Sequence, residues 1–250
     1  MSRNSPDNFL AGQVAMVTGG TRGIGRAIAE RLLREGARVA ICGRSQDGVA
    51  RAVDEMSTNP GGEIMGERAD VASLEDVRNF FAKVDDRFGK LDILINNAGV
   101  GIFRSVAELA PEDWHRMIDL NLTGVYYCCH EALPRFRKGG KGGYVINIGS
   151  LAGKNPFAGG AGYNASKFGL NGFAEAMMLD HRNDDVRVST IMPGSVDTDF
   201  GSEVNPGGSR ADWKIAPEDI AEVVVALVRM PQRTLISRVE IRPSKPKKQS

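Results

Sequence analysis

The chain has 250 residues, 42% hydrophobic and 25% charged, which suits a soluble globular protein with a sizeable core. A formal net charge of +1, with no apolar run near ~18 residues, argues against nucleic acid or a membrane as a partner. The three cysteines show neither zinc-ligand spacing nor a disulfide framework, so we expect no metal site and reduced thiols in a cytoplasmic protein.

Apolar runs and helical patterns alternate along the chain. Strands are predicted at 13–17, 36–43, 64–68 (the weakest), 91–95, 143–148, 186–192 and 235–241. Helices are predicted at 26–35, 46–57, 73–88, 111–137, 163–183 and 216–230. Pro134 lies inside the fourth helix and should kink it or end it early.

This alternation, with short connections, is typical of the α/β class. It predicts a Rossmann-type doubly wound parallel sheet of about seven strands with helices on both faces. No linker interrupts the pattern, so we expect residues 1–250 to form a single domain with flexible ends at 1–11 and 243–250.

The first motif with chemical meaning is Thr18-Gly-Gly-Thr-Arg-Gly-Ile-Gly25, between the first strand and the first helix. Glycines permit a tight turn close to a ligand, and free N–H groups at a helix N-terminus bind phosphate. The glycine spacing is G-x3-G-x-G, whereas the usual dinucleotide fingerprint is G-x-G-x-x-G, and a simple turn is the alternative. The cofactor-binding residues predicted here are Gly19, Thr21, Arg22, Gly23, Ile24 and Gly25.

The end of the second strand indicates which dinucleotide binds. NAD-binding versions place an acidic residue there for the ribose hydroxyls. This chain has Gly43-Arg44-Ser45 instead, without a carboxylate. Guanidinium groups from Arg22 and Arg44 suit a 2′-phosphate through charge-assisted hydrogen bonds. We therefore expect Arg44 and Ser45 to contact NADP(H) rather than NAD(H); the alternative is that both arginines are solvated surface residues.

The stretch Tyr163-Asn-Ala-Ser-Lys167 places a phenol and an ammonium about one turn apart on the same face of a predicted helix. A nearby positive charge stabilises phenolate, so the pKa of Tyr163 should fall from ~10 towards the working pH. Such a pair also occurs by chance in many helices, and its meaning depends on the residues around it. Ser150 follows the strand at 143–148, thirteen positions before the tyrosine.

Together these motifs resemble the short-chain dehydrogenase/reductase family over nearly the whole chain. The likeness is closest to the 3-oxoacyl-carrier-protein reductase group, a label that gathers many ketone and aldehyde reductases. The matching residues are Thr18-Gly-x3-Gly-x-Gly25, Asp70-Val71, Asn96-Asn-Ala-Gly99, Asn121, Ser150, Tyr163-x3-Lys167 and Pro193-Gly194 with Thr198.

The resemblance implies roles for the residues that match. Tyr163 would protonate the substrate carbonyl as hydride arrives and act as the base in reverse, while Lys167 would hold the nicotinamide ribose and lower the tyrosine pKa. Ser150 would hydrogen-bond the substrate oxygen, and Asn121 would help hold a water that links Lys167 to solvent. The alternatives are a strand-end turn for Ser150 and a helix hydrogen bond for Asn121. Further cofactor contacts would come from Asp70 and Val71 (adenine), Asn97, Ala98 and Gly99 (ribose), and Pro193, Gly194, Val196 and Thr198 (nicotinamide).

The substrate side is less defined. Residues 195–215 should form a substrate loop, with 101–104 opposite, and nothing there specifies a carboxylate, a phosphate or a sterol. The glycine-rich tail common in the family is missing after Ile236. By resemblance, the helices at 111–137 and 163–183 would pair two subunits in a homodimer, with a homotetramer as the alternative.

These observations predict an NADP(H)-dependent oxidoreductase that interconverts a small carbonyl compound and an alcohol, with 3-oxoacyl thioesters among the candidate substrates. The alternative is a non-catalytic NADP(H)-binding sensor or scaffold with the same fold. The presence of Ser150, Tyr163, Lys167 and Asn121 together favours the enzyme.

Overall fold

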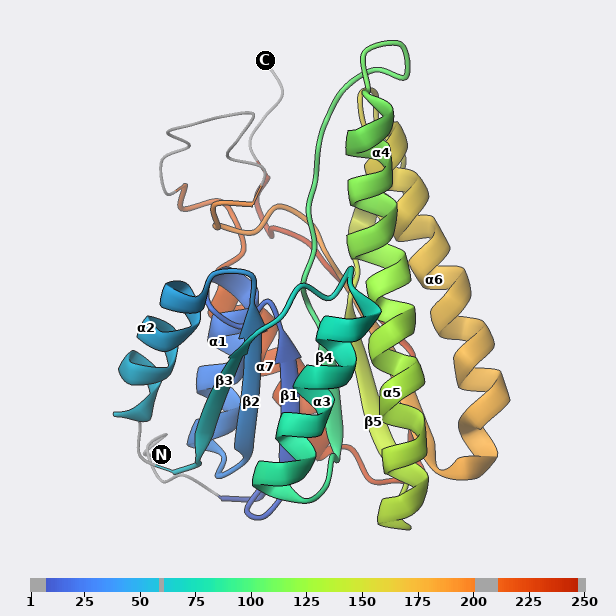
Figure 1. The fold of residues 1–250 in the computed structure, drawn as a ribbon. Helices are drawn as coiled ribbons and strands as arrows, with labels where there is room; N and C mark the ends of the chain where they lie inside the picture. The colour runs from blue at the N-terminus through green and yellow to red at the C-terminus, as the bar shows by residue number, and fades with distance from the viewer. Residues whose placement is uncertain (1–7, 59–60, 201–210, 247–250) are drawn as a thin grey trace.

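The computed structural model describes residues 8–58, 61–200 and 211–246. In this described part of the chain, seven parallel strands form one sheet in the order β3-β2-β1-β4-β5-β6-β7 (Figure 1). The strands are β1 (Val14–Thr18), β2 (Arg38–Gly43), β3 (Ile64–Arg68), β4 (Ile93–Asn96), β5 (Gly143–Ile148), β6 (Val186–Pro193) and β7 (Arg238–Ile241). The predicted doubly wound parallel sheet is confirmed.

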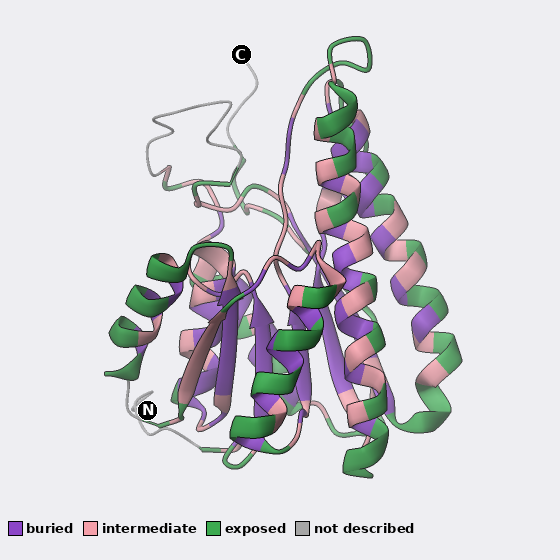
Figure 2. Cartoon of the chain, in the orientation of Figure 1, coloured by how far each residue is buried: buried purple, intermediate pink, exposed green. Residues whose placement is uncertain are grey.

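Helices cover both faces of this sheet. They are α1 (Gly23–Arg34), α2 (Gln46–Ser57), α3 (Leu74–Phe88), α4 (Pro111–Ile118), α5 (Gly124–Gly139), α6 (Ala161–His181) and α7 (Pro217–Arg229). Helices α1, α2 and α7 pack on one face, and α3, α5 and α6 on the other. The strands between them are largely buried, whereas the outer helix faces are exposed (Figure 2).

Strand β1 shows why the sequence folds this way. Its residues are all apolar except the last, as expected for a central strand that is covered on both faces. Val14 and Met16 enter the core beneath α3, α5 and α6, while Ala15 and Val17 enter the core beneath α1 and α7. Alternate side chains point to opposite faces, so one short run contributes to both cores.

The strand order places a crevice at the carboxyl edge of the sheet. Strand β1 pairs with β2 on one side and with β4 on the other, so the chain leaves these neighbouring strands in opposite directions. In open parallel sheets, ligands bind at such a point, outside the carboxyl ends of the strands. The glycine-rich loop after β1 and the Asn96–Gly99 loop after β4 both lie here.

The predicted helix at 111–137 consists of three consecutive helical segments. Helix α4 passes into a π-helical turn, η1 (Asp119–Thr123), and then into α5. The N–H of Gly124 donates to the carbonyl oxygen of Asp119, five residues earlier, which is the π-helical pattern. The expectation that Pro134 ends the helix early is wrong, because α5 continues to Gly139 and ends at Gly140, which has φ +68°.

Other element limits differ from the prediction by a few residues. Helix α1 begins at Gly23, so two glycines of the loop lie in its first turn, and α6 begins at Ala161. Strand β7 is shorter than predicted. Leu10, within the predicted flexible end, is fully buried, and its N–H donates to Glu35 O at 3.0 Å. The rest of the predicted ends, 1–7 and 247–250, lies outside the described residues.

The described helices include none that is both long enough and apolar enough to cross a membrane.

Replacement of Pro134 by alanine should stabilise the protein. Pro134 is exposed within α5 and provides no N–H for the helix, and an interior proline costs a helix about 3 kcal/mol relative to alanine. The more restricted unfolded chain offsets about 1 kcal/mol of this cost. We expect the Pro134→Ala variant to gain about 2 kcal/mol in the free energy of unfolding, measured by urea denaturation.

Pro111→Ala is the matched control, because Pro111 occupies the first turn of α4, where a missing N–H costs little. Its free energy of unfolding should change by less than about 0.5 kcal/mol. Equal effects of the two substitutions would show that Pro134 does not strain α5.

Candidate active site

The glycine-rich loop forms a tight connection from β1 into α1. Gly19 and Gly23 have φ of +63° and +55°, a conformation that L side chains rarely adopt. A Cβ at Gly25 would lie 2.3 Å from Gly19 O, so the loop can close only with glycine there. The N-cap residue of α1, Arg22, makes no side-chain cap, and the first turn carries no acidic residue. This helix end is suited to an anion such as a dinucleotide phosphate.

The loop after β4 is hydrogen-bonded to the glycine-rich loop. Thr18 Oγ1 accepts from the N–H groups of Asn97 and Ala98, each at 3.0 Å. Asn97 Nδ2 donates to the carbonyl oxygens of Thr18 at 2.9 Å and Gly19 at 3.1 Å. These bonds join the ends of β1 and β4, so two of the predicted cofactor segments form one rigid platform.

The end of β2 lies against the same loop. A Cβ at Gly43 would approach Thr21 Cγ2 at 2.9 Å, so Arg44 follows directly beside the glycine-rich loop. Arg22 and Arg44 are both exposed. Ser45 Oγ accepts the N–H of Gly48 at 3.2 Å as the N-cap of α2, a structural role that the cofactor prediction did not include.

The remaining predicted cofactor residues also lie at this edge. Asp70 Oδ1 accepts the N–H of Ala72 at 3.1 Å, and Val71 is buried against Gly124. After β6, Thr198 reaches the glycine-rich loop, because a Cβ at Gly23 would lie 3.3 Å from its Cγ2. The same segment contains Pro193, Gly194 and Val196, and Val196 forms a β-bridge with Ile215.

Ser150, Tyr163 and Lys167 meet between β5 and α6. Tyr163 and Lys167 emerge from α6, where the tyrosine is 7% and the lysine 5% exposed. Lys167 Nζ donates to the carbonyl oxygen of Ile148 at 3.0 Å and lies 5.8 Å from the centre of the Tyr163 ring. Ser150 follows β5, and its Oγ accepts the N–H of Ala152 at 3.1 Å and hydrogen-bonds the Tyr163 side chain. The structure thus brings together the three predicted catalytic residues.

The predicted fall in the pKa of Tyr163 is wrong for the chain without its cofactor. Burial raises the pKa of this phenol above its ordinary value, and the hydrogen bond from Ser150 only partly opposes that effect. Burial also lowers the pKa of Lys167 to about 8. Desolvation therefore outweighs the attraction between phenolate and ammonium, which the sequence argument had taken as dominant.

Asn121 lies in the π-helical turn, where its side chain is 1% exposed. Its Oδ1 accepts the N–H of Val100 at 2.8 Å, and its Nδ2 donates to Val100 O at 2.8 Å and to Ser166 Oγ at 3.0 Å. Ser166 Oγ in turn donates to the carbonyl oxygen of Tyr163 at 2.8 Å. Asn121 thus ties the chain after β4 to the catalytic helix, a contact that sequence reasoning did not foresee.

Gly99 lies between Asn121 and Lys167. A Cβ at this glycine would lie 3.1 Å from Asn121 Oδ1 and 3.8 Å from Lys167 Nζ. The two predicted relay residues therefore flank the same stretch of backbone.

Three phenylalanines lie on the substrate side of Tyr163. Phe103 packs edge-on against the tyrosine ring at 5.5 Å between centroids, and Phe200 contacts it at 5.8 Å. Phe157 packs against Phe103 at 5.6 Å. The ranges 101–104 and 195–215 had been predicted to line this side, but Phe157 was missed. Its place between the strand-end Ser150 and the helical Tyr163 was the available signal.

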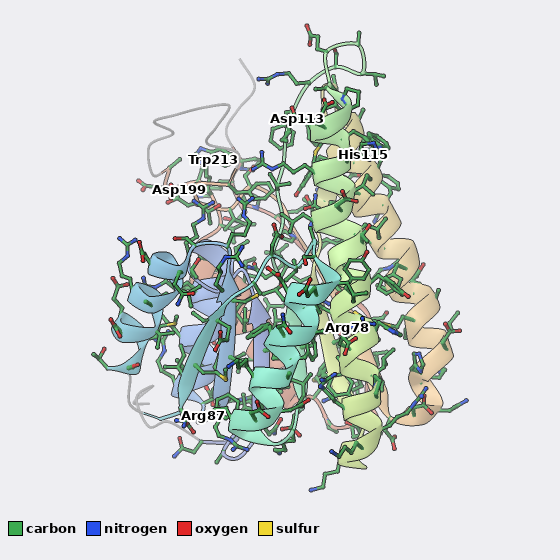
Figure 3. The ribbon with its side chains drawn as sticks, in the orientation of Figure 1. Arg78, Arg87, Asp113, His115, Asp199 and Trp213 are labelled. Carbon is green, nitrogen blue, oxygen red and sulfur yellow. The ribbon has the colours of Figure 1, made fainter. Side chains whose placement is uncertain are left out.

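The two described segments that flank residues 201–210 also lie over the carboxyl edge. Asp199 and Trp213 mark them in Figure 3, whereas Arg87, at the end of α3, lies at the opposite edge. A surface cavity of about 870 Å³ lies at that opposite edge, where Gln13, Ile93 and Tyr144 are among its lining residues. None of the predicted site residues lines it.

Comparison with known proteins agrees with this geometry. The family model described as short chain dehydrogenase matches residues 13–208. The chain is 36% identical over 211 residues to a 3beta-hydroxysteroid dehydrogenase of Mediterraneibacter gnavus, covering 84% of this chain and 73% of that protein. It is 34% identical over 229 residues to a 3-oxoacyl-(acyl-carrier-protein) reductase of Chlamydia pneumoniae, covering 88% and 91%.

A solved structure is also similar. It is a metagenomic short-chain oxidoreductase in complex with NADP, with a TM-score of 0.82 and 37% identity over 95% of this chain and 99% of that one. The family match spans most of the chain, and the described residues carry the Rossmann-type sheet and the Ser150–Tyr163–Lys167 cluster. The chain belongs to the short-chain dehydrogenase family.

Proposed function

We propose that this oxidoreductase uses NADP(H) to reduce a ketone or aldehyde to an alcohol, or to run the reverse reaction. The observation that carries the proposal is the buried cluster of Ser150, Tyr163 and Lys167 beside the glycine-rich loop. A phenol and an ammonium held in a nearly dry site provide a proton donor and a charge that stabilises its conjugate base.

The cofactor assignment rests on the residues after β1 and β2. The uncapped N-terminus of α1 would bind the pyrophosphate, and Arg44 with Arg22 would bind a 2′-phosphate. The similar solved structure in complex with NADP supports this choice. Asp70, Val71, Asn97, Ala98 and Gly99 would line the adenine and ribose portions, and Pro193 to Thr198 the nicotinamide.

The chain's own residues perform the proton chemistry. Ser150 Oγ would hold the substrate oxygen, and Tyr163 Oη would transfer its proton to that oxygen. NADPH supplies the hydride that the carbonyl carbon receives, and NADP⁺ remains. Lys167 would turn its ammonium to the ribose hydroxyls, and its charge would stabilise the tyrosinate that forms. Asn121 would position the segment next to Lys167 and help to hold the water of the proton relay.

The similarity to a 3-oxoacyl-(acyl-carrier-protein) reductase makes 3-oxoacyl thioesters one candidate substrate class. A non-catalytic sensor or scaffold that binds NADP(H) is the second candidate function. The burial of an ionisable lysine favours the enzyme, because a binding protein would have no need to bear that desolvation cost.

We also infer a homo-oligomer in a reducing compartment such as the cytoplasm. Trp114, Tyr126, Phe168 and Leu179 are large apolar side chains that α4, α5 and α6 leave exposed, which supports pairing through these helices. All three cysteines are buried and free, which supports reduced thiols.

Replacement of Tyr163 by phenylalanine tests the proposed acid. With NADPH and a panel of ketones, we expect Tyr163→Phe to lower kcat by about 10²- to 10⁴-fold with little change in NADPH affinity. Tyr127→Phe, on α5, is the control and should leave the rate unchanged. Equal rates for wild type and Tyr163→Phe would remove Tyr163 from the mechanism. NADPH binding by the wild type without turnover of any substrate would favour the sensor.

Replacement of Arg44 by aspartate tests the cofactor preference. Loss of a charge-assisted contact, with a carboxylate in its place, should weaken NADPH binding by about 10- to 100-fold and leave NADH binding equal or stronger. Arg51→Asp makes the same charge change on the exposed face of α2 and controls for general electrostatics. An unchanged NADPH-to-NADH ratio in Arg44→Asp would refute the 2′-phosphate contact.

The ionisation of Tyr163 can be measured in the chain without cofactor. Because burial raises its pKa, the phenolate absorbance that Tyr163→Phe removes should develop only above pH 10. For the same reason, the rate of ketone reduction should stay level through neutral pH and fall only as Tyr163 loses its proton. If the missing absorbance corresponds to a pKa below 10, the Lys167 charge outweighs burial after all.

A further inference from the structure

The three phenylalanines beside Tyr163 come from three separate segments of the chain. Phe103 follows β4, Phe157 lies between β5 and α6, and Phe200 follows β6. Their ring contacts connect in a row, from Phe157 to Phe103, from Phe103 to Tyr163 and from Tyr163 to Phe200. Each of these loops ends a strand at the carboxyl edge, so the rings converge on the proposed acid.

These rings are not simply part of the core. Phe157 is 46% and Phe200 47% exposed, whereas Phe81 and Phe136 in the core are fully buried. Half-exposed aromatic rings that gather at a reacting centre leave apolar surface for a ligand to cover. The chain also makes room for them, because a Cβ at Gly101 would lie 2.8 Å from the Phe200 ring and 2.9 Å from the Phe103 ring.

The charges near this wall do not suit an anionic substrate. Lys167 Nζ is directed to the carbonyl oxygen of Ile148, beneath the tyrosine ring. The neighbouring Arg104 is exposed, and its Nη1 donates to the backbone oxygen of Phe103. A carboxylate held against the rings would lose water without a matching buried cation, whereas an uncharged aromatic group would lose little.

We propose that this site is selective for aryl ketones and aldehydes, in which an aromatic ring is attached directly to the carbonyl carbon. The inference rests on the proposed function. With the carbonyl oxygen at Ser150 and Tyr163, the attached ring would be placed against Phe103 and Phe200. Aromatic pairs favour the edge-to-face and offset arrangements already adopted by these side chains, at centroid distances of 4.5–7 Å.

The substrate test compares acetophenone with cyclohexyl methyl ketone, which has a similar size but no aromatic ring, and with the thioester S-acetoacetyl-N-acetylcysteamine. Wild-type kcat/KM with NADPH should be about tenfold higher for acetophenone than for either alternative, because a well-placed ring contributes a few such contacts. Butanone provides the basal activity.

The variant Phe103→Leu keeps an apolar side chain and removes the ring. We expect it to lower kcat/KM for acetophenone by about tenfold and to leave butanone reduction unchanged, so the preference over cyclohexyl methyl ketone disappears. Phe157→Leu should act in the same direction with a smaller effect, because Phe157 contacts Tyr163 only through Phe103. Phe173→Leu on α6, whose ring contacts Tyr126, is the control and should change neither substrate.

Failure of this inference and failure of the proposed function look different. If butanone is reduced but acetophenone has no advantage over cyclohexyl methyl ketone, the aryl preference is refuted and the enzyme assignment stands. A clear preference for the acetoacetyl thioester would also overturn it in favour of acyl substrates. If none of these compounds is reduced while NADPH still binds, the proposed function itself fails.

Discussion

The burial of the Lys167 ammonium constrains the candidate site more than any other feature. A lysine held at 5% exposure loses most of its hydration, and within the described residues its Nζ makes one hydrogen bond, to Ile148 O. The cost of this desolvation appears as a pKa lowered to about 8. In the proposed function, the ribose hydroxyls of the cofactor accept from the same Nζ, so cofactor binding offsets a cost that the folded chain bears alone. Much of the catalytic arrangement would then be completed by the cofactor.

The parallel sheet explains how residues far apart in the sequence reach this lysine. Every strand of the described sheet runs in the same direction, so all loops that follow strands gather at one edge. Hydrogen bonds then fix the loops to one another. Thr18 binds the backbone of Asn97, and Asn121 binds that of Val100 and reaches Ser166 on the catalytic helix. Precision at the site therefore comes from side chains that need not touch a substrate.

Much of this could be predicted from the sequence, because it follows from local patterns. Apolar runs at strand spacing gave the sheet, and the glycines around Gly23 gave the turn into α1. Features that depend on tertiary balance could not be predicted. The helix limits near Pro134 depend on packing that outweighs a local penalty, and the pKa of Tyr163 depends on the depth of burial, which the spacing of Tyr163 and Lys167 does not contain. The position of Phe157 beside Phe103 depends on a loop path with no periodic signal.

The π-helical turn at Asp119–Thr123 has a consequence for the evolution of this chain. A π-turn holds one residue more than the α-helical turn it replaces, so it rotates everything that follows by about 100° around the helix axis. The sheet-facing side of α5, with Val125, Cys129 and Phe136, is set by that rotation relative to α4. Loss of a single residue here would keep the helix continuous but turn its apolar stripe towards solvent. The length of this segment is therefore restricted by angular phase, although its individual side chains are free to vary wherever they face outward.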